Sequence, residues 1–347
     1  MIAIQALALA AAGASTPVEP APAAESFALR FKAYREWSIL LPDERHEAIG
    51  EAIPFPHIAG GGFTAELRGT SLWLDRDGDG SVDVEVEAAD EPGQSALVLL
   101  RGSGTAGSDL RYAVRVSSDG RWSWASSCAM VGTVRGEKLT LIDQNGNGRY
   151  DDYGADAMIV GRGEAACFLS RVVNLDGELF ELEVSGDGTQ VELTPFQGQS
   201  GTLDLVSGFE SEALLRSVVV QSADGELSFE LSRAEEGLLV PAGEYSLHSG
   251  QVVLGKGVAT LAGGRMDSLS VGASGETTPT WGGPVEAEVV AFRQGGQVVF
   301  MPNEIYYYGG AGEEYSQFMP LGSSPEFALI DANTGDVLVN ATFPGNC

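Results

Sequence analysis

The chain has 347 residues, 44% of them apolar, and its 49 acidic and 20 basic side chains give a net charge of −29 at pH 7. A charge of this size repels the phosphates of nucleic acids and anionic lipids, which argues against both as partners, and it fits an attraction for cations as well as a merely solvated surface. The 46 glycines, with Asp, Asn and Ser, divide the apolar residues into short runs, as in strands joined by turns. We therefore predict a mainly β protein that is long enough for several domains.

The N-terminus begins with an apolar, alanine-rich run, MIAIQALALAAAGAS, and continues with a Pro/Ala/Glu segment. The run resembles the apolar core of a secretory signal cleaved near Ala14, although no Lys or Arg precedes it. We assign residues 1–26 to a signal peptide and a Pro/Ala-rich linker, which predicts a secreted, periplasmic or cell-envelope protein. A disordered or helical N-terminus is the alternative. No later stretch has the roughly 20 apolar residues of a membrane-spanning helix, so we expect no transmembrane segment in the mature chain.

Residues 25–55 have a mixed, partly helical pattern, and strand-like sequences follow from Gly60 onward. Among these strands, the segment LDRDGDGSVD from Leu74 to Asp83 has oxygen-bearing side chains at loop positions 1, 3, 5, 7 and 9 and a glycine at position 6. In a calcium loop the chain wraps around the ion at these positions, the glycine permits the sharp turn, and position 7 supplies its carbonyl oxygen. The predicted ligands are Asp75, Asp77, Asp79, Ser81 and Asp83.

The spacing DxDxDGxxD resembles the calcium loops of EF-hands, dockerins and thrombospondin type 3 repeats. Position 12, where an EF-hand has a bidentate glutamate, is Val86 here, and Glu85 and Glu87 point to the opposite face of a strand. Because strand-like sequences flank the loop, we expect a calcium loop within a β-hairpin and a modest affinity of about 10⁻⁴ to 10⁻³ M. A polar Asp/Gly hairpin turn is the alternative.

A second loop with the same spacing, DQNGNGRYD, begins at Asp143, and both loops follow a strand that begins after an Arg-Gly pair, which suggests an internal duplication. Two Asn replace two Asp, so we expect this loop to bind calcium more weakly than the first. Magnesium seldom uses all-protein cages, and no His or Cys lies nearby for a transition metal. The predicted ligands are Asp143, Asn145, Asn147, Arg149 and Asp151, with Asp152 and Asp156 close by.

The three cysteines match neither a dense disulfide framework nor a zinc-site spacing. In an exported protein, Cys128 and Cys167 are the natural disulfide pair, and closing their loop would stabilise the fold by roughly 4 kcal/mol. Two separate buried thiols are the alternative. Cys347, the last residue, is expected to be exposed.

Turns and strands continue to the C-terminus, and VPAGEYSL at 240–247 resembles a strand turn of secreted carboxypeptidase-regulatory-like or transthyretin-like sandwiches. We predict a β module with two calcium loops at 27–166, a β-sandwich-like module at 167–277 and an Ig-like β module at 278–347. The predicted fold class is thus a multidomain, mainly β protein built from antiparallel β-sandwich modules, with the calcium loops inserted between strands of the first module.

No pattern indicates catalysis, because the histidines are scattered, no GxSxG elbow occurs, and GSGTAG lacks the ending of a phosphate-binding loop. We expect His57 to be structural. The composition favours a secreted, non-enzymatic calcium-binding β protein with a structural, adhesion or cell-envelope role, whose partners are calcium ions and a polysaccharide or cell-surface protein, not nucleic acid.

Two alternatives remain. The first is a carbohydrate-binding module or an accessory protein of a hydrolase, with Trp122, Trp124 or Tyr306 to Tyr308 as a sugar platform. In the sequence IYYYGG, Tyr306 and Tyr308 fall on one strand face and Tyr307 on the other. The second is a hydrolase that uses scattered carboxylates.

Overall fold

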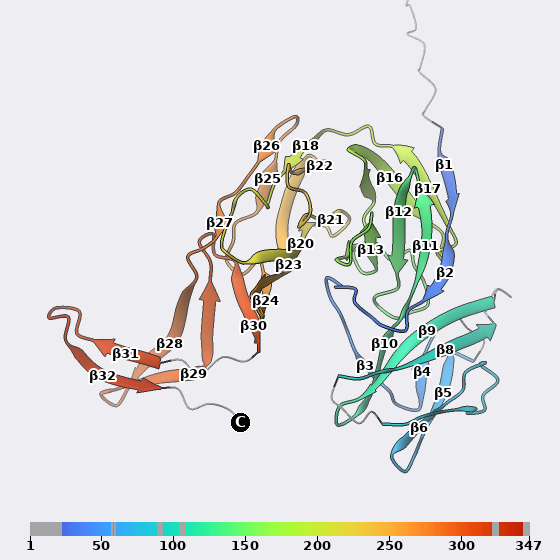
Figure 1. Ribbon diagram of the computed structural model, residues 1–347, viewed down its shortest axis with the longest axis horizontal. Helices are drawn as coiled ribbons and strands as arrows, with labels where there is room; N and C mark the ends of the chain where they lie inside the picture. Colours follow the sequence, from blue (N-terminus) through green and yellow to red (C-terminus); the bar gives the residue numbers. More distant parts are fainter. Residues whose placement is uncertain are drawn as a thin grey trace, which may run out of the picture.

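A computed structural model describes residues 23–56, 58, 60–88, 93–103, 109–320 and 326–342, and in these residues it contains strands, turns and loops but no helix. The strands form several mostly antiparallel sheets (Figure 1), so the predicted mainly β fold is confirmed. Most of the predicted signal peptide and linker, together with His57 and Cys347, lies outside the described residues. No described segment is a helix that could cross a membrane.

Four sheets make up the first structural unit. The first sheet contains β4 (Ala52–Pro54), β5 (Gly62–Arg68), β6 (Ser71–Leu74) and β7 (Val84–Val86). The second has the order β3 (Glu47–Ala48), β10 (Trp122–Ser126), β9 (Asp109–Ser118) and β8 (Ala96–Ser103). The third has the order β14 (Cys167–Phe168), β13 (Ala157–Val160), β12 (Glu137–Ile142), β11 (Cys128–Val134) and β2 (Arg30–Ala33). The fourth has the order β1 (Glu25–Ala28), β17 (Gln190–Pro195), β16 (Glu178–Val184) and β15 (Val172–Leu175).

The second structural unit is built on one large sheet with smaller pairings beside it. The large sheet has the order β21 (Ser228–Glu230), β20 (Leu214–Ser222), β23 (Gly243–Leu254), β24 (Gly257–Ala262), β30 (Glu314–Met319), β29 (Gln297–Tyr308) and β28 (Glu286–Gln294), and β25 (Leu269–Val271) also pairs with β23. The smaller pairings are β22 (Leu238–Pro241), β18 (Ser200–Leu203) and β26 (Glu276–Thr277), then β19 (Phe209–Glu210) with β27 (Trp281–Gly282), and β31 (Glu326–Ile330) with β32 (Val337–Thr342).

The stretch at 25–55 contains strands only, so the expectation of partly helical character was wrong. β1 joins β17 and β2 joins β11, each at the edge of a sheet. Hydrogen bonds from these distant partners outweigh the weak local preference of so short a segment. Because β1 begins at Glu25, the last residues of the predicted linker already belong to a strand.

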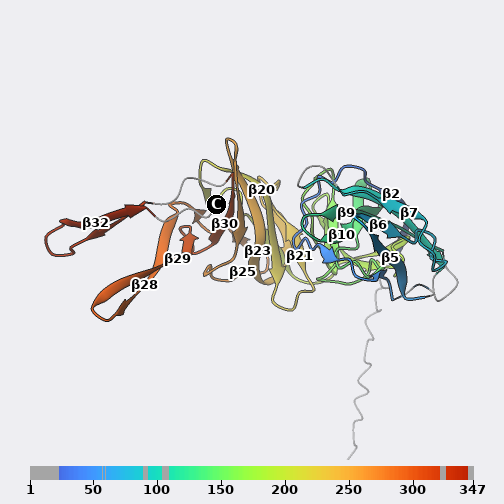
Figure 2. The same ribbon diagram turned by 90° about the horizontal axis from the view of Figure 1, so that it is seen from below.

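The hydrophobic clusters divide the chain differently from the predicted modules. The first cluster extends from Leu29 to Leu193 and also includes Val219 of β20. The predicted boundary at 166/167 therefore falls inside it, between paired strands β13 and β14. The second extends from Leu203 to Tyr315 and includes the fully buried Trp281, so the boundary at 277/278 falls inside it too. The hairpins β28–β29 and β31–β32 project from the far end of the second unit (Figure 2), and every side chain of β28 is exposed.

Four aromatic side chains form the centre of the first cluster. The Phe55 ring lies 5.5 Å from Phe63, 4.8 Å from Tyr112 and 5.7 Å from Trp124, measured between ring centroids. The first two contacts are edge-to-face, an arrangement that aromatic rings prefer. These residues come from loops and strands far apart in the sequence, and we call them the aromatic centre.

Candidate metal sites

The first predicted loop connects β6 to β7. Leu74 pairs with Val84 in this hairpin, so Asp75 directly follows one strand and Asp83 directly precedes the other. The strands expected on both sides of the loop are therefore present. Val86, at position 12, pairs with Leu72 and is buried in the core, while Glu85 is exposed.

The carboxylate of Asp75 organises this loop. The side chain is 1% exposed, its Oδ1 accepts hydrogen bonds from the N–H groups of Asp77 (3.2 Å) and Gly78 (2.7 Å), and its Oδ2 accepts one from Gly80 (2.8 Å). Gly78 and Gly80 have φ angles of 73° and 89°, which a glycine adopts without strain. The chain thus folds around one buried carboxylate.

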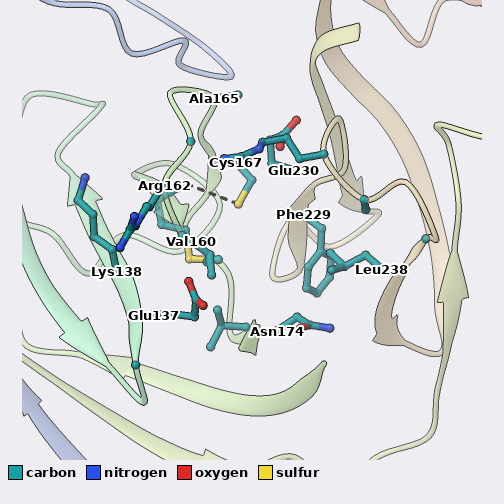
Figure 3. Close-up of a pocket in the computed structure, with 18 of the residues that line it drawn as sticks. Glu137, Lys138, Val160, Arg162, Ala165, Cys167, Asn174, Phe229, Glu230 and Leu238 are labelled. Carbon is teal, nitrogen blue, oxygen red and sulfur yellow. Dashed lines mark hydrogen bonds between the residues drawn. The ribbon is translucent and has the colours of Figure 1, made fainter. Parts of the chain in front are cut away.

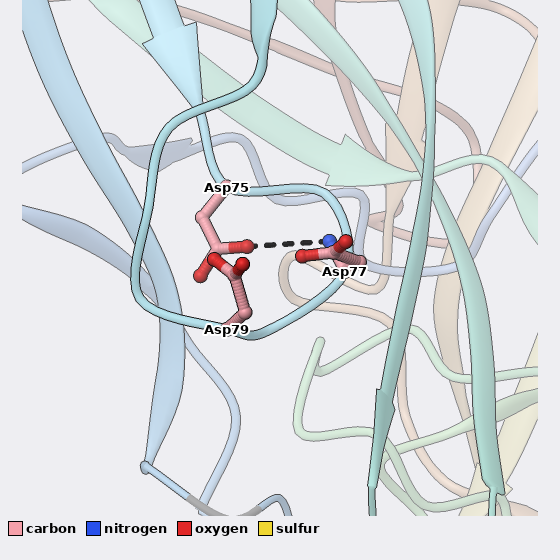
Figure 4. A group of neighbouring side chains, drawn as sticks. All are labelled: Asp75, Asp77 and Asp79. Atoms are coloured by element: carbon pink, nitrogen blue, oxygen red, sulfur yellow. Dashed lines mark hydrogen bonds between the residues drawn. The ribbon is translucent and has the colours of Figure 1, made fainter.

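Asp77 and Asp79 extend their carboxylates toward Asp75 (Figure 4), and one oxygen of each of the three residues lies within 4.8 Å of the others. Ser81 donates its N–H to Asp79 Oδ1 at 2.7 Å. Asp83 lies apart from this group, because its carboxylate accepts hydrogen bonds from the backbone N–H (2.9 Å) and the Nε (3.2 Å) of Arg76. Of the predicted ligands, the structure brings together three aspartates.

The second predicted loop connects β12 to β13. Like the first loop, it begins with a buried aspartate that accepts hydrogen bonds from backbone N–H groups. Asp143 is fully buried, its Oδ1 accepts hydrogen bonds from Gly146 (2.7 Å) and Asn147 (3.1 Å), and its Oδ2 accepts one from Gly148 (2.6 Å). Gly146 and Gly148 have φ angles of 72° and 85°, close to those of the glycines in the first loop. The repeated spacing therefore produces a repeated turn.

The remaining side chains of the second loop have specific partners. Asn145 and Asn147 both donate their side-chain N–H groups to Asp152 Oδ2, Asn145 at 2.9 Å. Arg149 and Asp151 instead form a two-pronged ion pair with each other, Nε to Oδ1 at 2.9 Å and Nη2 to Oδ2 at 2.5 Å. The predicted position-9 carboxylate of Asp151 is therefore held by Arg149, and Asp152 lies with the two amides.

Asp156 lies near the second loop in the sequence but is not among its predicted ligands. It directly precedes β13, is 1% exposed, and accepts a hydrogen bond from the N–H of Asp152 at its Oδ2 (3.0 Å), while its Oδ1 has no hydrogen-bond partner among the described residues. Burial and then the charge of Asp143 raise the pKa of Asp156 to about 9, and burial raises the pKa of Asp143 to about 6. Its only signal in the sequence is its position just before a strand.

Both loops pack against the aromatic centre. A Cβ placed on Gly148 would lie 2.9 Å from Phe55 Cδ1, one on Gly146 would lie 2.8 Å from Trp124, and one on Gly78 would lie 3.7 Å from Phe63. Tyr112 also donates its hydroxyl to the carbonyl oxygen of Asp143 at 3.4 Å. The loop conformations are therefore tied to the core of the first unit.

The predicted disulfide is absent, because Cys128 and Cys167 are both free, buried thiols. They lie on β11 and β14, at three strand spacings in one sheet, or about 14 Å. A disulfide needs Cα atoms about 4.4 to 6.8 Å apart. Cys128 Sγ lies 3.5 Å from Tyr150 Oη, and the Cys167 thiol donates to the carbonyl oxygen of Met158 at 3.7 Å, so each thiol has its own surroundings.

The aromatic residues considered as a sugar-binding platform differ in their exposure to solvent. Trp124 is 2% exposed and belongs to the core, so it offers no stacking surface. Tyr306 and Tyr308 stack with ring centroids 6.3 Å apart and planes 20° apart, and Tyr307 packs against Phe318. The predicted division of the three tyrosines between two faces is confirmed, and Tyr306 is 38% exposed.

A cavity of about 840 Å³ lies between the two units (Figure 3). Glu137, Lys138 and Arg162 line it from the first unit, and Glu230 and Arg233 line it from the second. The Glu230 carboxylate accepts hydrogen bonds from the backbone N–H groups of Val218 (3.0 Å) and Ser232 (2.9 Å), and burial raises its pKa. This carboxylate therefore anchors β20 and the turn after β21.

Cys167 also lines this cavity. Burial raises the pKa of its thiol to about 12, which keeps the sulfur protonated and weakly nucleophilic at neutral pH.

No protein family, curated protein or solved structure matched the chain in the comparisons.

Proposed function

We propose that this protein binds calcium ions in its two hairpin loops and that the ions hold the first unit in its folded conformation. One observation carries the proposal. Each loop wraps three backbone N–H groups around a buried aspartate, Asp75 or Asp143, and sets further side-chain oxygens beside it. Two loops with this arrangement in one chain make a plain Asp/Gly turn a poor explanation.

The donor chemistry favours calcium over other ions. Both loops present carboxylates and backbone carbonyls, and the second loop adds two side-chain amides. Calcium takes six to eight oxygen ligands at flexible geometry. Transition metals prefer imidazole and thiolate groups, and the buried thiols of Cys128 and Cys167 make contacts elsewhere. The net charge of −29 also draws cations toward the protein.

The role we propose is structural, in a secreted or cell-envelope protein without catalytic activity. Support comes from the apolar N-terminal run, from loops whose low expected affinity suits the millimolar calcium outside cells, and from sheets that form an extended scaffold. The exposed hairpins β28–β29 and β31–β32 offer surface for adhesion to a polysaccharide or to a cell-surface protein.

Thermal unfolding of the full chain in calcium and in a chelator tests this proposal. The melting temperature should rise in 5 mM calcium relative to EDTA, because an ion that binds only the folded state stabilises it by about 2.7 kcal/mol at a hundred times its dissociation constant. Magnesium at the same concentration is the control for ionic strength and charge screening. Identical melts in calcium and in EDTA would exclude calcium binding.

Carbohydrate binding is a second candidate because Tyr306 and Tyr308 form a stacked pair with one exposed ring. Exposed aromatic rings are surfaces on which sugar rings stack. Retention on insoluble polysaccharides, compared between the wild type and Tyr306→Ala, tests this candidate. Equal retention of the two proteins would refute a role for this pair.

A further inference from the structure

The two loops differ most at the residue that closes each of them. Asp83 directly precedes β7, and Asp156 directly precedes β13. The adjoining strand residues pair in the same way, Leu74 with Val84 and Ile142 with Ala157. Asp83 and Asp156 are therefore counterparts, each beside the aspartate that begins its loop.

In the first loop, an arginine neutralises the closing carboxylate. Arg76, at position 2, donates its backbone N–H and its Nε to Asp83, and its guanidinium forms an ion pair with the same carboxylate at 3.2 Å. A cation bound among Asp75, Asp77 and Asp79 would have to draw Asp83 away from this guanidinium. In the calcium-free first loop, Arg76 therefore already compensates the charge of the Asp83 carboxylate.

In the second loop, position 2 is Gln144, which is uncharged and directed to other partners. Its Nε2 donates to the carbonyl oxygen of Ala155 at 2.9 Å, and its Oε1 accepts the N–H of Asp43 at 3.2 Å. Arg149, the basic residue within the loop, is paired with Asp151. Within the part of the chain that the structure describes, no ion pair reaches Asp156.

Asp156 is thus a buried carboxylate without an ion pair among the described residues, although the charge of Arg149 acts on it, and its Oδ1 has no hydrogen-bond partner there. It accepts the N–H of Asp152, and the charge of Asp143 acts on it. Among the described residues, only the three carboxylates of Asp75, Asp77 and Asp79 have oxygens within 4.8 Å of one another, so the second loop would have to draw its carboxylates closer together around an ion. Asp152 in turn accepts hydrogen bonds from both side-chain amides of the loop. Carboxylates buried in this way are costly unless a cation meets them.

We propose that Asp156 and Asp152 complete the second loop as calcium ligands, in place of an EF-hand's position-12 glutamate, and that this loop is the tighter of the two sites. The inference rests on the calcium binding proposed above. The residues that would hold the ion supply six oxygens, the lower limit for calcium. They are Asp143, Asn145, Asn147, Asp152 and Asp156 through their side chains and Arg149 through its carbonyl group.

This order of affinity is the reverse of the one predicted from the two Asn residues. Formal charge alone makes the second loop weaker, but a carboxylate attracts a cation more strongly in the protein interior than at an exposed site such as Asp77 or Asp79. Once an ion displaces the proton of Asp156, the buried Asp143 and Asp156 compensate for the missing charges, whereas in the first loop Asp83 remains paired with Arg76.

Isothermal titration of the full chain with calcium chloride tests the inference. The wild type should bind two ions with distinct affinities, Asp156→Asn should weaken the tighter site by tenfold or more, and Asp79→Asn should weaken only the other site. Asp119→Asn, at the exposed tip of the β9–β10 hairpin, is the matched control and should change neither. Loss of the tighter site in Asp79→Asn, with that site intact in Asp156→Asn, would overturn the assignment.

Substitutions at position 2 of each loop provide a second test. They change the charge beside the closing carboxylate without replacing a proposed ligand. Arg76→Gln should strengthen the weaker site by about threefold to tenfold because it frees Asp83, whereas Gln144→Arg should weaken the tighter site. Opposite signs or no change in either variant would refute the role of the closing carboxylates. A wild type that shows neither binding heat nor a calcium-dependent melt would instead refute calcium binding as such.

Discussion

Replacing Asp156 by Asn should change stability in opposite directions with and without calcium. In calcium-free protein the folded carboxyl has a pKa of about 9, against an ordinary value of 3.8. A raised carboxyl pKa means that its contribution to stability is fully present below pH 3.8 and is lost as the pH rises toward 9. At pH 7 the folded state therefore retains a proton that the unfolded chain has released.

The size of this effect follows from the pKa and from the size of the unit. Retaining the proton over roughly three pH units costs at most about 4 kcal/mol. The amide of Asn needs partners of its own, so we expect Asp156→Asn to recover about 1 to 2 kcal/mol. At roughly 2 to 4 °C per kcal/mol for a unit of this size, the melting temperature in EDTA should rise by about 2 to 8 °C.

In calcium the order of stability should reverse. In 5 mM calcium, a site with a dissociation constant of about 10⁻⁴ M is at about fiftyfold excess and stabilises the wild type by about 2.3 kcal/mol, or roughly 5 to 9 °C. Asp156→Asn loses the gain from the second loop and keeps that from the first.

Differential scanning calorimetry at pH 7, in EDTA and in 5 mM calcium, measures both effects, and Asp119→Asn is the control. A melt in EDTA that is lower for Asp156→Asn than for the wild type would show that the carboxylate is compensated in the calcium-free fold. A full calcium response in the variant would show that Asp156 is not a ligand. Either result would refute the reasoning.

Three further predictions concern the packing of the second loop, the titration of His248 and the state of the cysteines. Gly148→Ala should lower the free energy of unfolding by about 2 kcal/mol or more in urea denaturation, because φ is 85° and the new Cβ would lie 2.9 Å from the Phe55 ring. Gly120→Ala, at a similar φ but with no atom within 4 Å, should cost only about 1 kcal/mol, and equal losses would argue against the packing of the loop on the core. Burial lowers the pKa of His248, whose ring lies 4.7 Å from Phe168. The contribution of the neutral imidazole to stability is therefore lost as the pH falls below 6.5. Between pH 7.5 and 5.5, His248→Gln should lose less stability than the wild type, and parallel pH profiles of the two proteins would contradict this. In a Cys347→Ser chain, dithiothreitol should leave the melting temperature unchanged and a thiol reagent should react only after unfolding, whereas a fall under reducing conditions would reveal a disulfide.

The local chemistry of the loops could be predicted from the sequence. Asp75 and Asp143 each begin a turn whose glycines adopt positive φ, and strands adjoin both loops, because the hydrogen bonds that define such a turn join residues at most five apart. The burial of Val86, which leaves position 12 without an oxygen, also follows from the alternation of side chains along a strand. Contacts between residues that lie only a few positions apart can therefore be predicted from the local sequence.

The tertiary structure decided what depends on residues far apart in the chain. β1 joins β17 across more than half of the first unit, so the limits of the units could not be read from the spacing of strands. The same holds for Cys128 and Cys167, which are placed on strands too far apart to pair, and for Trp124, which is packed against Phe55.

Asp83 and Asp156 show the same division within the candidate sites. Both are aspartates before a strand, and the sequence distinguishes them by the longer second loop and by Arg76 and Gln144 at position 2. Asp83 pairs with Arg76, whereas Asp156 is buried without an ion pair. This difference depends on how each hairpin lies against the core. The sequence alone thus determined each turn and the aspartate that begins it, whereas burial and charge compensation, which set the expected affinity, were decided by tertiary packing.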